Sequence, residues 1–125
     1  MARCYACHCT DCQRRSGSAF ALILPVNSAH FAATGKVVAV EQPEGHGRVA
    51  KLHACPTCLT RLFTTNPAWP GVTMIRVGTL DDTQAVRPAF HIWTRSKQPW
   101  VLLPSDVPHL ETEPSDLNEW RALLG

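Results

Sequence analysis

The chain has 125 residues, of which 45% are hydrophobic and 18% are charged, and its formal net charge is +2. This size and composition predict one soluble globular domain, residues 1–125, and the scattered Arg and Lys residues lack the basic patch typical of nucleic-acid binding. No apolar run approaches the roughly 20 residues that cross a bilayer, and no secretory signal opens the chain. We therefore expect a cytoplasmic protein with neither membrane nor nucleic-acid partners.

Ten prolines, seven glycines and short β-branched runs predict many strands and few helices. Strands are expected at residues 18–26, 36–41, 48–53, 72–77 and 90–94. A turn over residues 43–47 joins the second and third of these into a hairpin. One helix is predicted, at the end of the chain, where Ser115 or Asp116 can cap it. Its apolar face comprises Leu117, Trp120 and Leu124.

All six cysteines fall in two clusters, and the first contains a CxCxxC trio made of Cys7, Cys9 and Cys12. Three thiolates on one zinc ion leave the fourth position for water or a substrate, as in catalytic rather than structural sites. Because soft sulfur suits a thiolate-rich site, a substrate thiol is a more suitable fourth ligand than water. The trio therefore favours sulfur chemistry over hydrolysis.

The second cluster, Cys55 and Cys58, supplies half of a structural tetrathiolate zinc site. The other half can come from the first cluster, so that four of the six thiolates hold one purely structural zinc, or from elsewhere. A redox CxxC pair is a weaker interpretation, because the surroundings show no βαβ pattern.

The run from Cys7 to Phe20 resembles the CHCxxC…G…F signature of the glutathione-dependent formaldehyde-activating enzyme family, also called the centromere-protein-V-like domain. The likeness continues downstream in the CxxC pair, in Gly78–Asp82 (GTLDD) and in Pro88 with His91-Ile92-Trp93. Residues 96–100 (SKQPW) and 106–108 (DVP) complete it. These motifs occur in the family's order over about 100 residues.

The resemblance implies a mainly β, β-tent (Mss-like) fold pinned by zinc. It assigns a zinc taken to be catalytic to Cys7, Cys9 and Cys12, and it makes Cys55 and Cys58 the later half of a structural zinc site. The family's earlier CxC pair has no counterpart before Cys7, which indicates either a coding frame that extends upstream of Met1 or a shortened relative. Cys4 is an alternative ligand for this site. Leu59 replaces the glycine that usually follows the CxxC pair.

Beside the trio, Arg14 and Arg15 are candidate substrate-binding residues, because guanidinium groups pair with carboxylates; a solvated face is the alternative. The side chain of His8 is expected to point away from the metal, and His91 is expected to have a core or hydrogen-bonding role. No acid–base residue is assigned.

The leading hypothesis is a zinc-dependent carbon–sulfur lyase-type enzyme that adds a thiol such as glutathione to a small aldehyde. In it, zinc on the trio binds the thiol as a thiolate, which attacks the carbonyl carbon. The alternative is a non-catalytic structural zinc module that binds a protein partner. The sequence leaves the true substrate and the oligomeric state open.

Overall fold

The computed structural model describes residues 3–44 and 48–125. Its described part contains one seven-stranded sheet and two α-helices. The strands are β1 (Cys4–Cys7), β2 (Ala21–Asn27), β3 (Val38–Pro43), β4 (Val49–Ala54), β5 (Arg61–Thr65), β6 (Val72–Arg76) and β7 (Pro88–Ile92). The helices are α1 (Thr10–Ser16) and α2 (Leu117–Leu124), with 3₁₀ turns at Ser28–His30, Val77–Thr79 and Thr94–Ser96. The predicted mainly β fold with a short C-terminal helix is confirmed.

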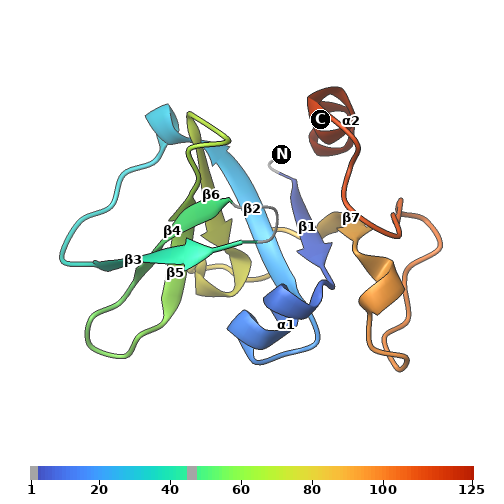
Figure 1. Cartoon of the computed structure of the whole chain (residues 1–125), viewed down its shortest axis with the longest axis horizontal. Helices are drawn as coiled ribbons and strands as arrows, with labels where there is room; N and C mark the ends of the chain where they lie inside the picture. The colour runs from blue at the N-terminus through green and yellow to red at the C-terminus, as the bar shows by residue number, and fades with distance from the viewer. Residues whose placement is uncertain (1–2, 45–47) are drawn as a thin grey trace.

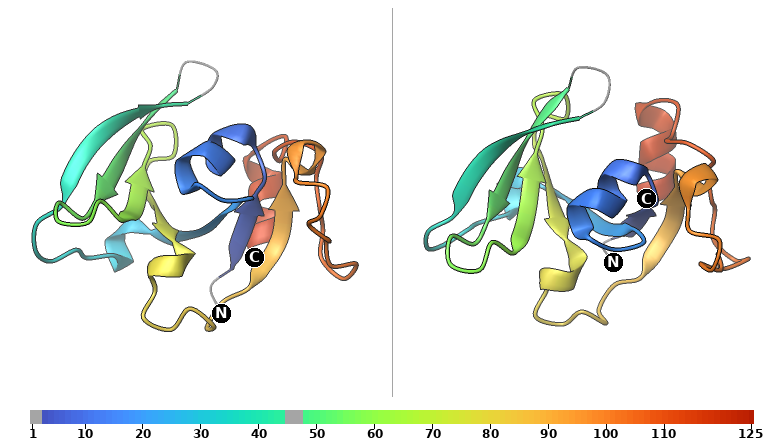
Figure 2. Two further views of the ribbon diagram at one scale, coloured as in Figure 1. Left: turned by 90° about the horizontal axis from the view of Figure 1, so that it is seen from below. Right: turned by 60° about the horizontal axis from the view of Figure 1, so that its bottom comes forward.

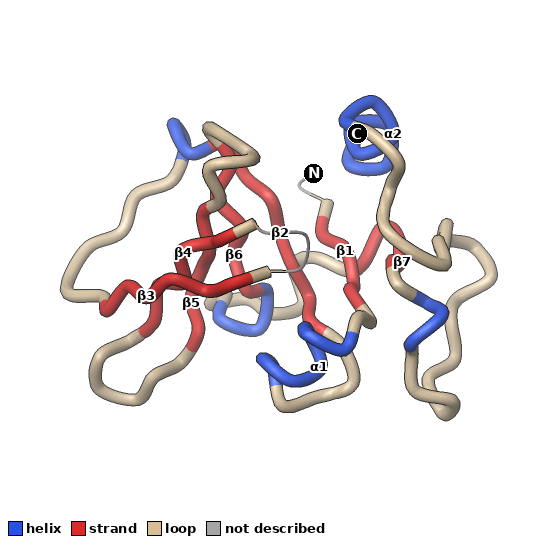
Figure 3. Tube along the Cα trace, in the orientation of Figure 1, coloured by secondary structure: helices blue, strands red, loops and turns tan. Residues whose placement is uncertain are grey.

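The strands follow the order β3-β4-β5-β6-β2-β1-β7, and all neighbours are antiparallel except β1 and β7. Long tan loops connect several of them in Figure 3. In Figure 1, α1 lies at the end of β1, and α2 lies near its start. Both views of Figure 2 place α1 between strands β3, β4 and β5 on one side and strands β1 and β7 on the other. The cysteine trio, which lies at the start of α1, is therefore between these two parts of the sheet.

The main core lies around β1 and β7, where Phe90 has no exposed surface. Its ring stacks on that of Tyr5, with 5.4 Å between the centroids, and both rings contact Trp120 of α2 edge-on. This packing explains how an eight-residue helix, too short to be stable alone, is held in place. Asp116 caps α2 by accepting from the backbone N–H of Glu119, as the sequence predicts.

Five predicted strands are present with shifted ends, but the prediction of a single helix was wrong. α1 has no buried residue and therefore no apolar periodicity that would have revealed it. β1 and β5 were not predicted, because four and five residues give little pattern to read. The turn predicted over residues 43–47 includes residues 45–47, which lie outside the described part of the chain. No helix among the described residues is long and apolar enough to cross a membrane.

Candidate metal centre

The three cysteines of the first cluster converge at the junction of β1 and α1. Cys7 is the last residue of β1, Cys9 is the N-cap of α1, and Cys12 lies in the first turn of the helix. Their sulfur atoms all lie within 4.8 Å of one another. Cys7 is buried, whereas Cys9 and Cys12 are half-buried. A strand end followed closely by a helical turn therefore places the three thiols near one another within residues 7–12.

Hydrogen bonds make Cys9 the most acidic of the three thiols. Those from the side chains of Cys12 and Cys7 lower its pKa, and the backbone N–H of Cys12 also donates to Cys9 Sγ, over 3.3 Å. The pKa of Cys7 is raised, because its side chain is the hydrogen-bonding partner of Cys12 and Cys9 and because it is buried. A thiol must lose its proton to bind a metal, so Cys9 is the member best prepared to do so.

The donor set fits zinc. Zn²⁺ binds thiolate sulfur at about 2.3 Å in tetrahedral geometry, which corresponds to a sulfur–sulfur separation of roughly 3.8 Å. The separations here, up to 4.8 Å, need a contraction of about 1 Å at most. Cys7, Cys9 and Cys12 would hold the ion, and no fourth protein ligand joins this group among residues 3–44 and 48–125.

A polar network supports the loop that carries the trio. The Gln13 side-chain amide donates to the carbonyl oxygens of His8, at 2.8 Å, and Ser96, at 2.9 Å. Gln98 donates to Gln13 Oε1 at 2.8 Å, and the Ser96 hydroxyl donates to the His8 carbonyl. The peptide between Cys7 and Cys9 is thus tied to the segment that follows β7. Sequence reasoning missed this role of Gln13, although it lies within the cysteine motif.

His8 is fully buried and is not a member of the metal-binding group. Its Nε2 atom lies 2.9 Å from Nδ1 of His91, and its ring packs on Phe20. Burial is the main cause that lowers the pKa of His8, to about 4, and the nearby His91 lowers it further. Both histidines therefore lie in the interior as a hydrogen-bonded pair.

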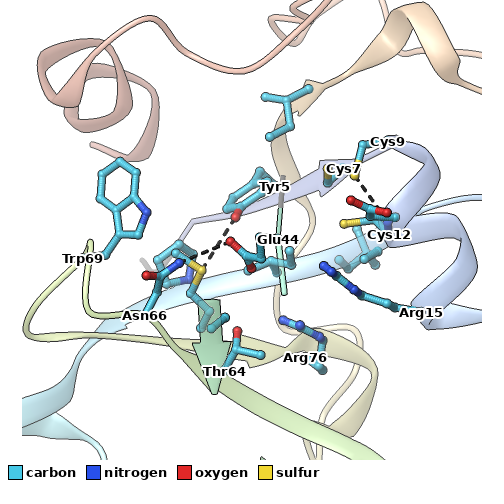
Figure 4. A pocket seen from close by; sticks show the side chains of 18 of the residues that line it. Tyr5, Cys7, Cys9, Cys12, Arg15, Glu44, Thr64, Asn66, Trp69 and Arg76 are labelled. Carbon is cyan, nitrogen blue, oxygen red and sulfur yellow. Dashed lines mark hydrogen bonds between the residues drawn. The ribbon is translucent and has the colours of Figure 1, made fainter. Parts of the chain in front are cut away.

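The trio lies on the wall of a cavity of about 1120 Å³. The cavity extends from α1 across β2, β5 and β6 to α2, and Figure 4 shows the cysteines at one edge of it and Trp69 at the other. Met74 and Trp120 also line the end away from the sulfur atoms. Small-molecule sites commonly occupy about 300–1,000 Å³, so the cavity is large enough for a substrate well beyond formaldehyde in size.

The two arginines suggested by the sequence face different surroundings. Arg15 lines the cavity, and its guanidinium donates to the Pro43 carbonyl. Arg14 is exposed, pairs with Asp11 at 3.3 Å and is not among the cavity-lining residues. The structure also brings Arg61 and Arg76 to the cavity, which sequence reasoning missed. The available signal was Arg76 itself, a charged residue in the otherwise uncharged run VTMIRV.

The second cysteine pair lies apart from the trio, in the turn between β4 and β5. Cys58 is exposed, its sulfur lies 3.0 Å from the Thr60 hydroxyl, and neither Cys55 nor Cys58 joins a group of three potential ligands among the described residues. Four thiolates drawn from both clusters therefore do not meet in this structure. Cys4 is buried beside Leu24 and Val77 and does not join the trio. A structural zinc on Cys55 and Cys58 stays a prediction.

Fold and site together define a class, a mainly β protein with a three-cysteine cluster that could hold a metal ion and that lines a cavity. The sequence profile of the glutathione-dependent formaldehyde-activating enzyme family matches residues 2–96. The chain belongs to this family, which confirms the resemblance carried by its cysteine motif. No curated protein matches the chain closely enough to specify the relationship further.

Proposed function

We propose that the protein is a zinc-dependent enzyme of carbon–sulfur lyase type, which adds a thiol such as glutathione to a small aldehyde at Cys7, Cys9 and Cys12. The observation that carries this proposal is the trio's position. Three thiols within 4.8 Å of one another line a substrate-sized cavity, with no fourth ligand among the described residues. A structural site would instead be expected to be closed by four protein ligands.

In the proposed reaction, one carbon–sulfur bond forms and the carbonyl π bond breaks. The thiol proton ends on the former carbonyl oxygen, so that R–SH and an aldehyde give a hydroxyalkyl thioether without any oxidant or reductant. Bound zinc would supply the acidity that keeps the substrate sulfur as a thiolate at neutral pH. The cavity wall would place the aldehyde next to that sulfur, and the Gln13 network would keep the three cysteine side chains in position.

Two substitutions test this proposal. Cys9→Ser removes one ligand of the trio, whereas Arg14→Met changes an exposed side chain outside the cavity and is the control. In cobalt-substituted protein, glutathione is expected to change the absorption bands of wild type and Arg14→Met and to leave those of Cys9→Ser unchanged.

The same three proteins are then compared for exchange between free formaldehyde and its glutathione adduct, followed by NMR. Wild type and Arg14→Met should accelerate the exchange above the uncatalysed rate, and Cys9→Ser should not. Equal exchange with all three proteins and with buffer would refute the enzyme proposal.

A second candidate, a non-catalytic zinc module that binds a protein partner, is supported by the edge strand β3. Val38 and Val40 on this strand are 37% and 50% exposed, and an open strand edge is a common site of strand addition. Cobalt bands that respond to neither glutathione nor small thiols would favour this module over the enzyme.

A further inference from the structure

Five arginines line the cavity. Arg48 lies 3.8 Å from Glu113 and Arg121 belongs to α2, while Arg15 comes from α1, Arg61 from β5 and Arg76 from β6. Figure 4 shows Arg15 and Arg76 extending into the same part of the cavity, on the side of Cys12. Like charges gathered in a partly buried space repel one another, and such an arrangement requires a compensating anion.

The acidic residues on the cavity wall are already engaged elsewhere. Asp11 pairs with Arg14, and Glu113 lies 3.8 Å from Arg48. Glu44 accepts a hydrogen bond from the Asn66 amide at 3.2 Å. No carboxylate of the described residues forms an ion pair with Arg15, Arg61 or Arg76. Their positive charge is therefore not neutralised by the acidic residues of the cavity.

Arg76 is the least satisfied of the three arginines. Arg61 donates to Gln42 Oε1 at 2.8 Å, and Arg15 donates to a backbone carbonyl, whereas Arg76 Nη1 is buried with no partner among the described residues. Burial lowers the pKa of Arg76, attraction to Tyr5 and Cys12 raises it, and repulsion from Arg61 and Arg15 lowers it again. A buried guanidinium nitrogen without a hydrogen-bond partner costs free energy unless an acceptor reaches it.

We propose that Arg76, assisted by Arg15 and Arg61, binds a carboxylate of the substrate thiol and is the residue that determines substrate specificity at this site. The inference rests on the proposed function for the sulfur end of the substrate. The planar guanidinium of Arg76 suits a carboxylate, which it can bind through two parallel hydrogen bonds. Arg15 and Arg61 keep their present partners and contribute charge.

The position of Arg76 also explains why the carboxylate should belong to the thiol rather than to the aldehyde. Arg76 and Cys12 line the same cavity, and Figure 4 shows Arg76 on the side of Cys12, so a ligand on Arg76 lies near the trio. A short mercaptocarboxylate, with its two ends a few bonds apart, can therefore reach the metal centre and the arginine together. Formaldehyde carries no group for Arg76 to bind.

Three probes distinguish the contribution of the thiol from that of the carboxylate. They are 3-mercaptopropionate, which carries both groups, 2-mercaptoethanol, which carries only the thiol, and propionate, which carries only the carboxylate. Their affinities for the zinc-loaded wild-type protein are measured by titration calorimetry. The wild type is expected to prefer 3-mercaptopropionate over 2-mercaptoethanol by about 10- to 100-fold, the typical contribution of a charged hydrogen-bonded pair. Propionate should compete with 3-mercaptopropionate. Equal affinity for the two thiols would overturn the proposal without requiring any variant.

Arg76→Met removes the charge at similar length, and Arg14→Met is the matched control outside the cavity. The preference should disappear in Arg76→Met and persist in Arg14→Met, with equal zinc content and unchanged affinity for 2-mercaptoethanol. Arg76→Lys, which keeps the charge but loses the planar fork, should show an intermediate preference.

Arg76→Met could instead lose zinc, or bind both thiols more weakly by the same factor. Either result would mean that the arginine only balances the charge of the cysteines, and the proposal would be wrong. The proposed function fails separately, when neither thiol perturbs the bands of cobalt-substituted protein. In that case propionate binding that depends on Arg76 would still support the carboxylate site, and its absence would overturn it.

Discussion

Removing the Gln13 side chain should weaken metal binding by the trio, although Gln13 is not one of the three potential ligands. Gln13 makes three side-chain hydrogen bonds, to the carbonyls of His8 and Ser96 and from the amide of Gln98. At a net contribution of about 0.5–1.5 kcal/mol each, Gln13→Ala should lower the free energy of unfolding by about 2–4 kcal/mol. Loss of a group that orients metal ligands typically weakens metal affinity by about 10- to 100-fold, and we expect that loss here.

Urea denaturation measures the first effect, and competition with a chelator for zinc measures the second. Gln98→Ala is the matched control, since it removes one of the three hydrogen bonds and should cost about 1 kcal/mol. Gln13→Glu keeps the shape but cannot donate to the two carbonyls, so it should resemble Gln13→Ala. If Gln13→Ala proves no more damaging than Gln98→Ala in both assays, the supporting role assigned to Gln13 is wrong.

Three further predictions concern the fold. Phe90→Ala should lower the free energy of unfolding by about 3–5 kcal/mol in urea, because the ring is fully buried, and a loss below about 1 kcal/mol would contradict this packing. Asp116→Ala should cost about 1 kcal/mol through loss of the α2 cap, measured by thermal denaturation, and an unchanged melting temperature would argue against the cap. Leu59→Gly should stabilise the protein by about 1 kcal/mol, since Leu59 has φ 61° and is 69% exposed; destabilisation would show that its side chain contributes more than the strain costs.

The sequence predicts those features whose signal lies in a continuous pattern. Short β-branched runs predicted the approximate positions of five strands, and a cap at Ser115 or Asp116 indicated α2, which Asp116 caps in the structure. The CxCxxC spacing pointed to one local group of thiols, and the structure brings these three sulfur atoms together. Leu59 illustrates a signal of another kind. The resemblance identified it as standing in place of a glycine, and its backbone has the left-handed conformation that glycine favours.

What the sequence could not give depends on contacts between distant segments. Nothing near His8 indicates that it meets His91, because their contact arises from the parallel pairing of β1 with β7. The arginines of the cavity come together only when β5 and β6 are placed opposite α1. In the same way, the partners of Gln13 beyond β7 follow from the tertiary fold rather than from the motif.

The position of β1 inside the sheet has a consequence for biosynthesis. This strand precedes the other six in the chain, yet it lies between β2 and β7, and Ala6 pairs with His91. Contacts of such large sequence separation form slowly, and this one cannot form until β7 has been made. The thiols that follow β1 therefore lack their surrounding structure until β7 has been synthesised. During that interval oxidants can oxidise these thiols and free metal ions can bind them, before β1 pairs with β7.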